Sequence, residues 1–110
     1  MRKLFVSVLL LVATALFSFG TPAMAAGNPA EGAKVFAGNC AACHVGGNNV
    51  INPAKTLKKE DLVKYGKYSE EAIYYQAMNG AGAMPNFKRL GETNLRNVAA
   101  YVYEQATKGW

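Results

Sequence analysis

The only histidine of this 110-residue chain follows directly after two cysteines, in the segment Cys40-Ala41-Ala42-Cys43-His44. Two thiols three residues apart at a helix end can both reach the vinyl groups of one porphyrin, and the adjacent imidazole can then coordinate the iron. The C-x-x-C-H pattern is typical of a c-type haem attachment site. We therefore expect Cys40 and Cys43 to form two thioether bonds and His44 to be an axial ligand of the iron.

Three other interpretations fit parts of this motif. A redox dithiol of the thioredoxin type also contains C-x-x-C, but it is expected within a βαβ unit, and the sequence has no convincing strand pattern. A structural zinc site takes four protein ligands, whereas one histidine and two cysteines supply three of the usual kind. A coincidental occurrence of the pattern in an exported chain is the remaining alternative. The haem interpretation agrees best with the cysteine count, the export signal and the alanine-rich composition.

The second axial position of a haem iron requires a further donor. The sequence has no second histidine, and two of its four methionines fall in the N-terminal export signal. Met78 lies in a predicted helix beside Ile73 and Ala77, where a methionine is more often part of the core. Met84 lies in the loop Gly80–Pro85, whose small residues let the backbone approach a flat cofactor. Met84 is therefore the expected ligand, and packing at the loop tip is the alternative for its side chain.

The first 25 residues have the pattern of a secretory signal. Arg2 and Lys3 are followed by an uncharged apolar run over Leu4–Phe19 and then by the small-residue sequence Ala23-Met24-Ala25. The apolar run has 16 residues, fewer than the roughly 20 that a transmembrane helix needs. We expect cleavage after Ala25, which leaves one domain over residues 26–110 without a membrane span.

Removal of this signal changes the charge balance. The chain has 12 Lys and Arg against 7 Asp and Glu, and loss of Arg2 and Lys3 lowers the basic count to 10, for a mature net charge of +3. A net charge of +3 is modest, and the sequence lacks the strong basic stripe that nucleic-acid binding requires. Nucleic acid is therefore not an expected partner.

Helical signals begin at the start of the mature domain. Asn28 as the N-cap and Pro29 at the first helical position predict a helix that ends near Cys43 or His44. The residues expected to share the buried face of this helix are Ala33, Phe36, Ala37 and Cys40.

Three further helices follow along the chain. We expect them over residues 59–65, from an N-cap at Ser69 to about Met78, and over residues 93–107, where apolar residues recur every three or four positions. The first and last helices are predicted to cross near Gly32 and Tyr101. The fold class predicted from these patterns is all-α.

The apolar residues of the mature domain are small. Of its 39 hydrophobic residues, 14 are alanine and only 12 are valine, isoleucine or leucine. A domain of this size has little core to spare, and a disulfide between two cysteines so close together would stabilise little. A bound prosthetic group would fill the interior of the domain.

Several segments along the whole mature chain resemble those of one family. They are Glu31-Gly32 through Phe36 and Asn39, Lys55-Thr56-Leu57, Tyr75-Gln76, Asn79-Gly80, Ala83-Met84-Pro85, Val98–Val102, Gln105-Ala106 and Trp110. Together with the attachment motif, they resemble the cytochromes c6 within the class I cytochromes c. The attachment motif is shared by every cytochrome c, whereas the pattern from Gln76 to Pro85 with the terminal tryptophan is much more selective. The resemblance implies a class I cytochrome c fold, with about four helices wrapped around one covalently bound haem.

The resemblance also implies a role for individual residues. These roles are thioether links at Cys40 and Cys43, axial ligation of the iron at His44 and Met84, tuning of the haem potential by Gln76, and partner docking at Lys88 and Arg89. A solvated surface is the alternative for the two basic residues. Ala81 departs from the pattern, because many members have lysine there.

Two expectations concern the surroundings of the haem. The second ring N–H of His44 is predicted to donate to a backbone carbonyl near Pro53, since such bonds fix the orientation of a ligand. One haem edge must approach the surface, and small or apolar residues are expected to frame a contact patch there, namely Val45, Ala81, Ala83 and Pro85.

The function implied by the resemblance is electron transfer by a monomeric carrier. It would pass electrons from the cytochrome b6f complex to photosystem I in the thylakoid lumen, and the export signal also fits the periplasm. One alternative is a c6-like paralogue or respiratory carrier that donates to a terminal oxidase. Others are a small haem peroxidase, which needs an open axial position, and a haem-based redox sensor, which needs a displaceable ligand.

Overall fold

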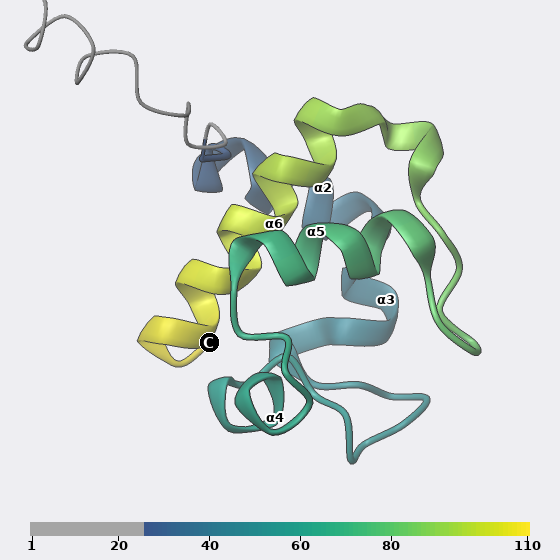
Figure 1. The fold of residues 1–110 in the computed structure, drawn as a ribbon, viewed down its shortest axis with the longest axis vertical. Coiled ribbons are helices and arrows are strands. Elements are labelled where there is room, and N and C mark those ends of the chain that lie inside the picture. The colour runs from purple at the N-terminus through teal and green to yellow at the C-terminus, as the bar shows by residue number, and fades with distance from the viewer. Residues whose placement is uncertain (1–25) are drawn as a thin grey trace, which may run out of the picture.

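The computed structural model describes residues 26–110, and the export signal predicted for residues 1–25 lies outside this range. The described residues form helices and no strand, as predicted. None of these helices combines the length and the apolar character needed to cross a bilayer. The α-helices are α2 (Pro29–Asn39), α3 (Ala41–His44), α4 (Lys59–Lys64), α5 (Glu70–Asn79) and α6 (Gly91–Lys108), with 3-10 turns η1 (Val45–Gly47) and η2 (Lys88–Leu90) between them (Figure 1).

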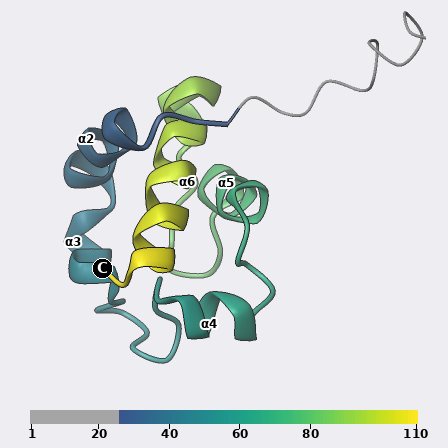
Figure 2. The same cartoon turned by 90° about the vertical axis from the view of Figure 1, so that its left-hand side faces the viewer.

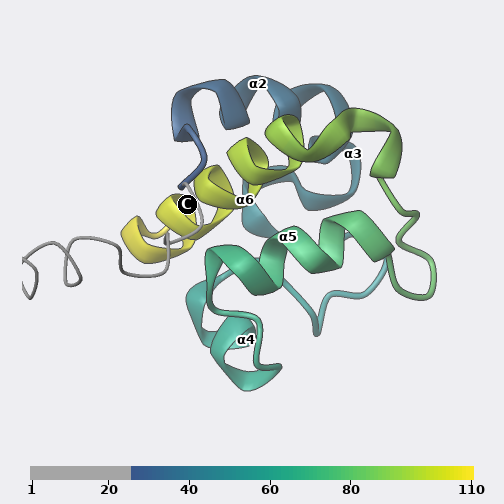
Figure 3. The same cartoon turned by 45° about the horizontal axis from the view of Figure 1, so that its top comes forward.

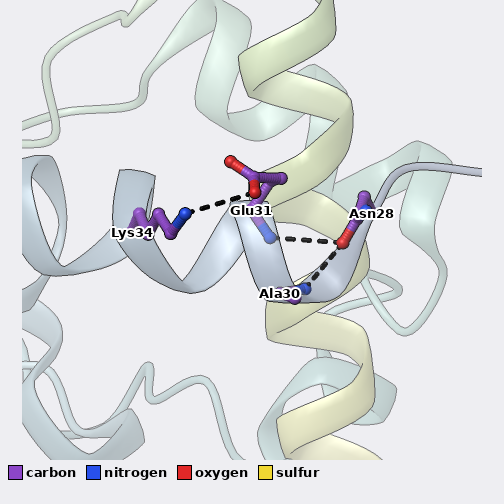
Figure 4. A network of polar contacts seen from close by, with 4 residues as sticks. All are labelled: Asn28, Ala30, Glu31 and Lys34. Carbon is purple, nitrogen blue, oxygen red and sulfur yellow. Dashed lines mark hydrogen bonds and ion pairs between the residues drawn. The ribbon is translucent and has the colours of Figure 1, made fainter.

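The start of α2 is fixed by the N-cap that the sequence predicts. The Asn28 side-chain oxygen accepts hydrogen bonds from the backbone N–H groups of Ala30, at 2.9 Å, and Glu31, at 3.2 Å (Figure 4). Glu31 also pairs with Lys34 one turn later. The backbone N–H of Asn28 donates to the side-chain oxygen of Asn97 in α6, at 2.8 Å. The cap therefore both begins α2 and ties it to the last helix.

Helices α2 and α6 cross at a glycine. A Cβ atom on Gly32 would lie 1.9 Å from the carbonyl oxygen of Asn97 and 2.9 Å from Cβ of Tyr101. Only a residue without a side chain lets the two backbones approach this closely. The predicted crossing near Gly32 and Tyr101 is confirmed by these distances, and Figure 2 shows α2 beside α6.

Helix α6 lies between α2 and α5 and supplies most of the core (Figure 3). Its buried stripe includes Leu95, which is 2% exposed, and its other members are Val98, Ala99, Ala100, Val102 and Ala106. From α5, Ile73, Tyr74 and Ala77 are buried against the same cluster. The core is therefore rich in alanine, as the composition indicates.

The C-terminal residue Trp110 joins distant parts of the chain. Its ring packs on Phe36, with centroids 5.4 Å apart, and on Tyr101, at 6.0 Å. A Cβ atom on Gly47 would lie 2.4 Å from the indole ring, and the indole N–H donates to the carbonyl of Leu57 at 2.9 Å. Trp110 thus holds the loop that follows the cysteine motif against α2 and α6.

The helix boundaries agree with most of the predictions. Ser69 caps α5 by accepting from the N–H of Ala72 at 3.0 Å, as expected. Helix α6 begins at Gly91, two residues before the predicted start. The first helix is not continuous to His44, because α2 ends at Asn39 and Cys40, with φ −115° and ψ −32°, separates it from α3. Ala37, predicted on the buried face of α2, is exposed.

Candidate functional site

The three residues of the cysteine motif occupy one helical turn. The carbonyl oxygen of Cys40 accepts the backbone N–H groups of Cys43, at 3.2 Å, and His44, at 2.9 Å. Cys40 ends α2 and is the N-cap of the short helix Ala41–His44, which carries Cys43 and His44. Cys40 and His44 are half-buried and Cys43 is exposed, and the two thiols are free. The structure brings the three predicted residues together.

The environment of Cys40 disagrees with a redox dithiol. Burial, together with the proximity of Cys43, raises the pKa of the Cys40 thiol to about 11. Reactive dithiols of the thioredoxin type depend on a lowered thiol pKa, because the thiolate is the nucleophile. Within residues 26–110, no three histidine, cysteine or carboxylate side chains gather as a metal cluster. The polypeptide environment of Cys40 thus argues against a dithiol that cycles between oxidised and reduced forms.

The imidazole of His44 is oriented by the backbone of the following loop. Its Nδ1 lies 2.9 Å from the carbonyl oxygen of Asn48. A carbonyl can only accept, so Nδ1 carries the proton and Nε2 keeps a free lone pair, the form in which histidine binds a metal. The prediction that a backbone carbonyl would fix the ring is confirmed, but its position near Pro53 was wrong. The 3-10 turn η1 brings the chain back within four residues, before Pro53 is reached.

Asn49 organises the loop that carries this carbonyl, and the sequence analysis missed it. Its side-chain oxygen accepts from the N–H groups of Ile51, at 3.1 Å, and Asn52, at 2.9 Å, while its amide donates to the carbonyl of Lys55 at 2.9 Å. The N–H of Val50 donates to the carbonyl of Cys43 at 2.9 Å. Two asparagines after two glycines are a signal for such side-chain turns, although the sequence does not say which backbone groups they bind.

Met84 closes a tight turn in the loop after α5. Its N–H and carbonyl bond reciprocally with those of Ala81, each at 3.0 Å, across Gly82 and Ala83. Gly80 begins the turn with a φ of +71°, and a Cβ atom there would lie 2.6 Å from the carbonyl oxygen of Met84. Glycine is required at this position by both its dihedral angle and the close backbone approach. The conformation of this loop is therefore fixed by its own hydrogen bonds and by Gly80.

Gln76 lies beside the sulfur of Met84. Its side-chain amide nitrogen is 4.0 Å from Met84 Sδ, a long hydrogen bond of the kind that a thioether accepts. Both side chains are half-buried. A thioether sulfur has two lone pairs, so one remains for a metal while the other faces the amide. Met78, the other candidate, packs on the hydrophobic core.

The two basic residues predicted for docking lie just beyond this loop. Lys88 and Arg89 belong to η2 and are both exposed. The Arg89 guanidinium lies over the ring of Phe87, 5.3 Å from its centroid, and the N–H of Phe87 donates to the carbonyl of Ala77 at 2.9 Å. Arg89 is thus held next to the Met84 turn and remains open to solvent. Val45, Ala81, Ala83 and Pro85, the residues expected to frame a contact patch, are likewise exposed.

The donor set of this region fits a haem. Two free thiols and an imidazole with an available Nε2 occupy one turn, and a thioether is held on a separate loop. His/Met cytochromes c use the same groups: the methionine thioether and the histidine imidazole bind the iron, and the two cysteines bind the haem covalently. Such a set would hold a haem iron through the imidazole and the thioether, and a bound haem would supply one-electron transfer.

Comparisons with known proteins agree with this chemistry. The family model described as "Cytochrome C oxidase, cbb3-type, subunit III" matches residues 27–102. Cytochrome c6 from Thermostichus vulcanus is 56% identical over 111 aligned residues, which cover 100% of this chain and 98% of that protein. Cytochrome c6 from Nostoc is 51% identical over 100% of this chain and 99% of its own length. This chain belongs to the cytochrome c6 family.

A solved structure of a cytochrome c6 supports the fold. The protein from the diatom Phaeodactylum tricornutum superposes with a TM-score of 0.75 at 48% identity, covering 76% of this chain and 100% of that chain. The class I cytochrome c fold predicted from the sequence is therefore confirmed. Cytochrome c6C from Synechococcus has a TM-score of 0.70 at 33% identity, with 73% of this chain and 99% of that chain covered.

Membership in the cytochrome c6 family settles the general character of the protein. It is a c-type cytochrome with covalently bound haem c and iron, and it carries electrons rather than catalysing a reaction.

Proposed function

We propose that this chain carries electrons from the cytochrome b6f complex to photosystem I, with Cys40 and Cys43 as haem thioethers and His44 and Met84 as axial ligands. The observation that carries the ligand assignment is the 2.9 Å contact between His44 Nδ1 and the Asn48 carbonyl. This contact occupies one ring nitrogen of His44 and leaves the other available to bind iron. The reciprocal bonds between Ala81 and Met84 hold the second donor in a defined turn.

The residues around the two ligands would keep the site rigid during electron transfer. Bound haem supplies a one-electron iron couple whose potential depends on its axial ligands and their hydrogen bonds. The Asn48 carbonyl fixes the plane of the His44 ring, and the Gln76 amide draws electron density from the Met84 sulfur. The two partner groups, a backbone carbonyl and a side-chain amide, carry no charge. Little atomic rearrangement would therefore accompany each electron.

The exposed side of the Met84 turn suits a short-lived encounter. Ala81 and Ala83 have small side chains and are exposed, so a partner can approach the turn closely. Arg89, held over Phe87 beside the turn, supplies a positive charge at the edge of this patch. Interfaces of electron carriers are small, and charge at the rim acts mainly on the association rate. Lys88 and Arg89 are thus the residues we assign to docking.

The relatives favour this assignment over a c6-like paralogue. Among solved structures, identity is 48% to the diatom cytochrome c6, 42% to cytochrome c6B from Synechococcus and 33% to cytochrome c6A from Arabidopsis thaliana. The alternative of a respiratory carrier is motivated by the matched family model, which is named after an oxidase subunit. With the export signal predicted for residues 1–25, we place the mature protein in the thylakoid lumen or the periplasm, as a monomer.

The decisive experiment compares two electron acceptors. Reduced protein is mixed with photosystem I or with a purified terminal oxidase, and its reoxidation is followed optically after a flash or after mixing. We expect fast reoxidation by photosystem I. Arg89→Glu should slow the second-order rate about tenfold at low salt, while Lys34→Glu, a matched charge change on α2, should leave it unchanged. Reoxidation by the oxidase alone would show a respiratory carrier.

A further inference from the structure

The positive charge of the mature domain is concentrated in one short segment. Residues 26–110 have a net charge of +3, and residues 55–68 contain five lysines against two carboxylates, which accounts for the whole excess. In the rest of the mature domain, five basic and five acidic residues balance. This segment consists of α4 and the turns on either side of it, so the charge asymmetry belongs to one end of the molecule (Figure 1).

The side chains of this segment place cations around an aromatic ring. The ammonium groups of Lys55 and Lys64 lie 5.3 Å and 5.5 Å from the centre of the Tyr65 ring. Asp61 is occupied by the turn before α4, because its carboxylate accepts both the N–H and the hydroxyl of Thr56. Glu60 is exposed. Because five lysines outnumber these two carboxylates, the electrostatic potential around the segment is positive.

Apolar groups are exposed among these cations. Val63 is 56% exposed and Tyr65 is 39% exposed, whereas Leu62, the residue before Val63, is buried in the core. We name the group formed by Lys55, Val63, Lys64, Tyr65 and Lys67 the α4 surface. Two lysine ammonium groups approach the tyrosine ring, and the valine adds exposed apolar area on the same helix, so positive charge and apolar groups lie together on this surface.

We propose that the α4 surface binds reversibly to anionic lipid headgroups at a membrane. Lysines near a membrane are attracted by its negative surface potential, and tyrosine prefers the interfacial region where one end of its ring is apolar and the other is wet. A specific and stable protein–protein interface needs roughly 20–30 residues a side, more than this short helix and its turns present. A lipid surface needs no such shape complementarity, so the small size of the surface favours lipid.

This binding would not use the electron-transfer patch. Helix α4 lies at one end of the molecule, and the loop after α5 that carries Met84 lies on another side, as the views in Figure 1 and Figure 3 agree. The proposal therefore stands independently of the acceptor assigned above. Three net charges give weak, salt-sensitive attachment, which would confine the protein near a membrane without fixing it there.

The test uses the mature haem protein and sedimentation with lipid vesicles. We expect binding at low salt to phosphatidylcholine vesicles that contain phosphatidylglycerol, and none to pure phosphatidylcholine. The double variant Lys64→Glu/Lys67→Glu should bind at least about tenfold more weakly, and Val63→Ser should weaken binding severalfold without changing net charge. The optical spectrum and circular dichroism show that each variant is folded.

A second double variant separates the α4 surface from total charge. Lys34→Glu/Lys88→Glu makes the same change in net charge outside the segment and should retain most of the binding. Equal weakening by both double variants would overturn the proposal, because attraction would then depend on overall charge. Absence of vesicle binding, with salt-sensitive binding to an immobilised acidic polypeptide that the Lys64→Glu/Lys67→Glu variant loses, would also overturn it and assign the surface to an acidic protein.

Discussion

The crossing of α2 and α6 and the two segments that carry the expected iron ligands are stabilised in different ways. At the crossing, a glycine lets two backbones touch, and buried side chains of α6 fill the adjoining space. At the ligand segments, most of the named contacts are hydrogen bonds to backbone groups in loops, such as the reciprocal bonds of Ala81 and Met84. His44 and Met84 are only half-buried by the polypeptide. The first region is a scaffold held by packing, whereas the second consists of two loops whose conformation is set by hydrogen bonds.

This difference explains how so small a core can support a redox site. The scaffold fixes the ends of each loop, and local hydrogen bonds then determine which groups face the haem. Trp110 connects the two regions, because it packs on Phe36 and also binds the carbonyl of Leu57. A change in the scaffold should therefore reduce the stability of the whole protein, while a change in the loops should mainly alter the site.

The largest effect is expected at the crossing. In Gly32→Ala, the new Cβ would lie 1.9 Å from the Asn97 carbonyl oxygen, so α2 and α6 must separate. We expect a loss of about 2 kcal/mol in unfolding free energy, within the range for overpacked sites. Gly38→Ala is the matched control, since a Cβ there meets nothing within 4 Å, and it should gain about 0.5–1 kcal/mol. Denaturant titration of both variants measures the contrast, and equal stability would show that the crossing tolerates separation.

A smaller effect is expected where Trp110 connects scaffold and loop. Trp110→Phe keeps an aromatic ring against Phe36 but removes the N–H that donates to the Leu57 carbonyl at 2.9 Å. The cost should be about 1 kcal/mol, the usual value of such a bond. Tyr68→Phe removes an exposed hydrogen bond to Thr107 and should cost less than about 0.5 kcal/mol. If thermal unfolding ranks the two in the opposite order, the indole bond does not link the regions.

The smallest effect is a pH dependence in the turn before α4. Hydrogen bonds from the Thr56 hydroxyl and backbone lower the pKa of Asp61 below its usual value. A carboxyl with a lowered pKa stabilises the folded state above its unfolded pKa, and this contribution is lost as the pH falls through the folded pKa. Thr56→Val should therefore raise the pKa of Asp61 and reduce stability slightly near about pH 7. The difference from wild type should be smaller in strong acid, where the substitution removes only the bond from the Lys58 N–H to the Thr56 hydroxyl. An NMR titration of the Asp61 carboxyl, with unfolding curves at neutral and at acid pH, checks this; a Thr56→Val effect as large in acid as at neutral pH would show that the Asp61 charge contributes nothing.

Local sequence signals predicted the scaffold well. Asn28 and Ser69 cap the helices they were expected to cap, and the Gly32 crossing follows from one small residue opposite an apolar stripe. The cysteine motif placed its three residues on one turn because the pattern itself is local.

The polar partners within the loops were harder to predict. The acceptor for His44 was expected near Pro53, yet it is the carbonyl of Asn48, and the role of Asn49 was missed. Which backbone group meets a side chain depends on the path of an irregular loop, and no periodicity encodes that path. The end of α2 at Cys40 was also missed, although Gly38 and Asn39, residue types common at helix ends, directly precede it.

The central claim, that Met84 and His44 hold the iron from two separate segments, is tested most directly by proton NMR of the reduced haem protein. The methyl group of an iron-bound thioether lies over the porphyrin and is shifted strongly upfield by its ring current. We predict that Met84→Ala abolishes this resonance and lowers the reduction potential, while Met78→Ala, which changes a methionine packed on the core, retains both. A resonance that persists in Met84→Ala, or is lost only in Met78→Ala, would contradict the account.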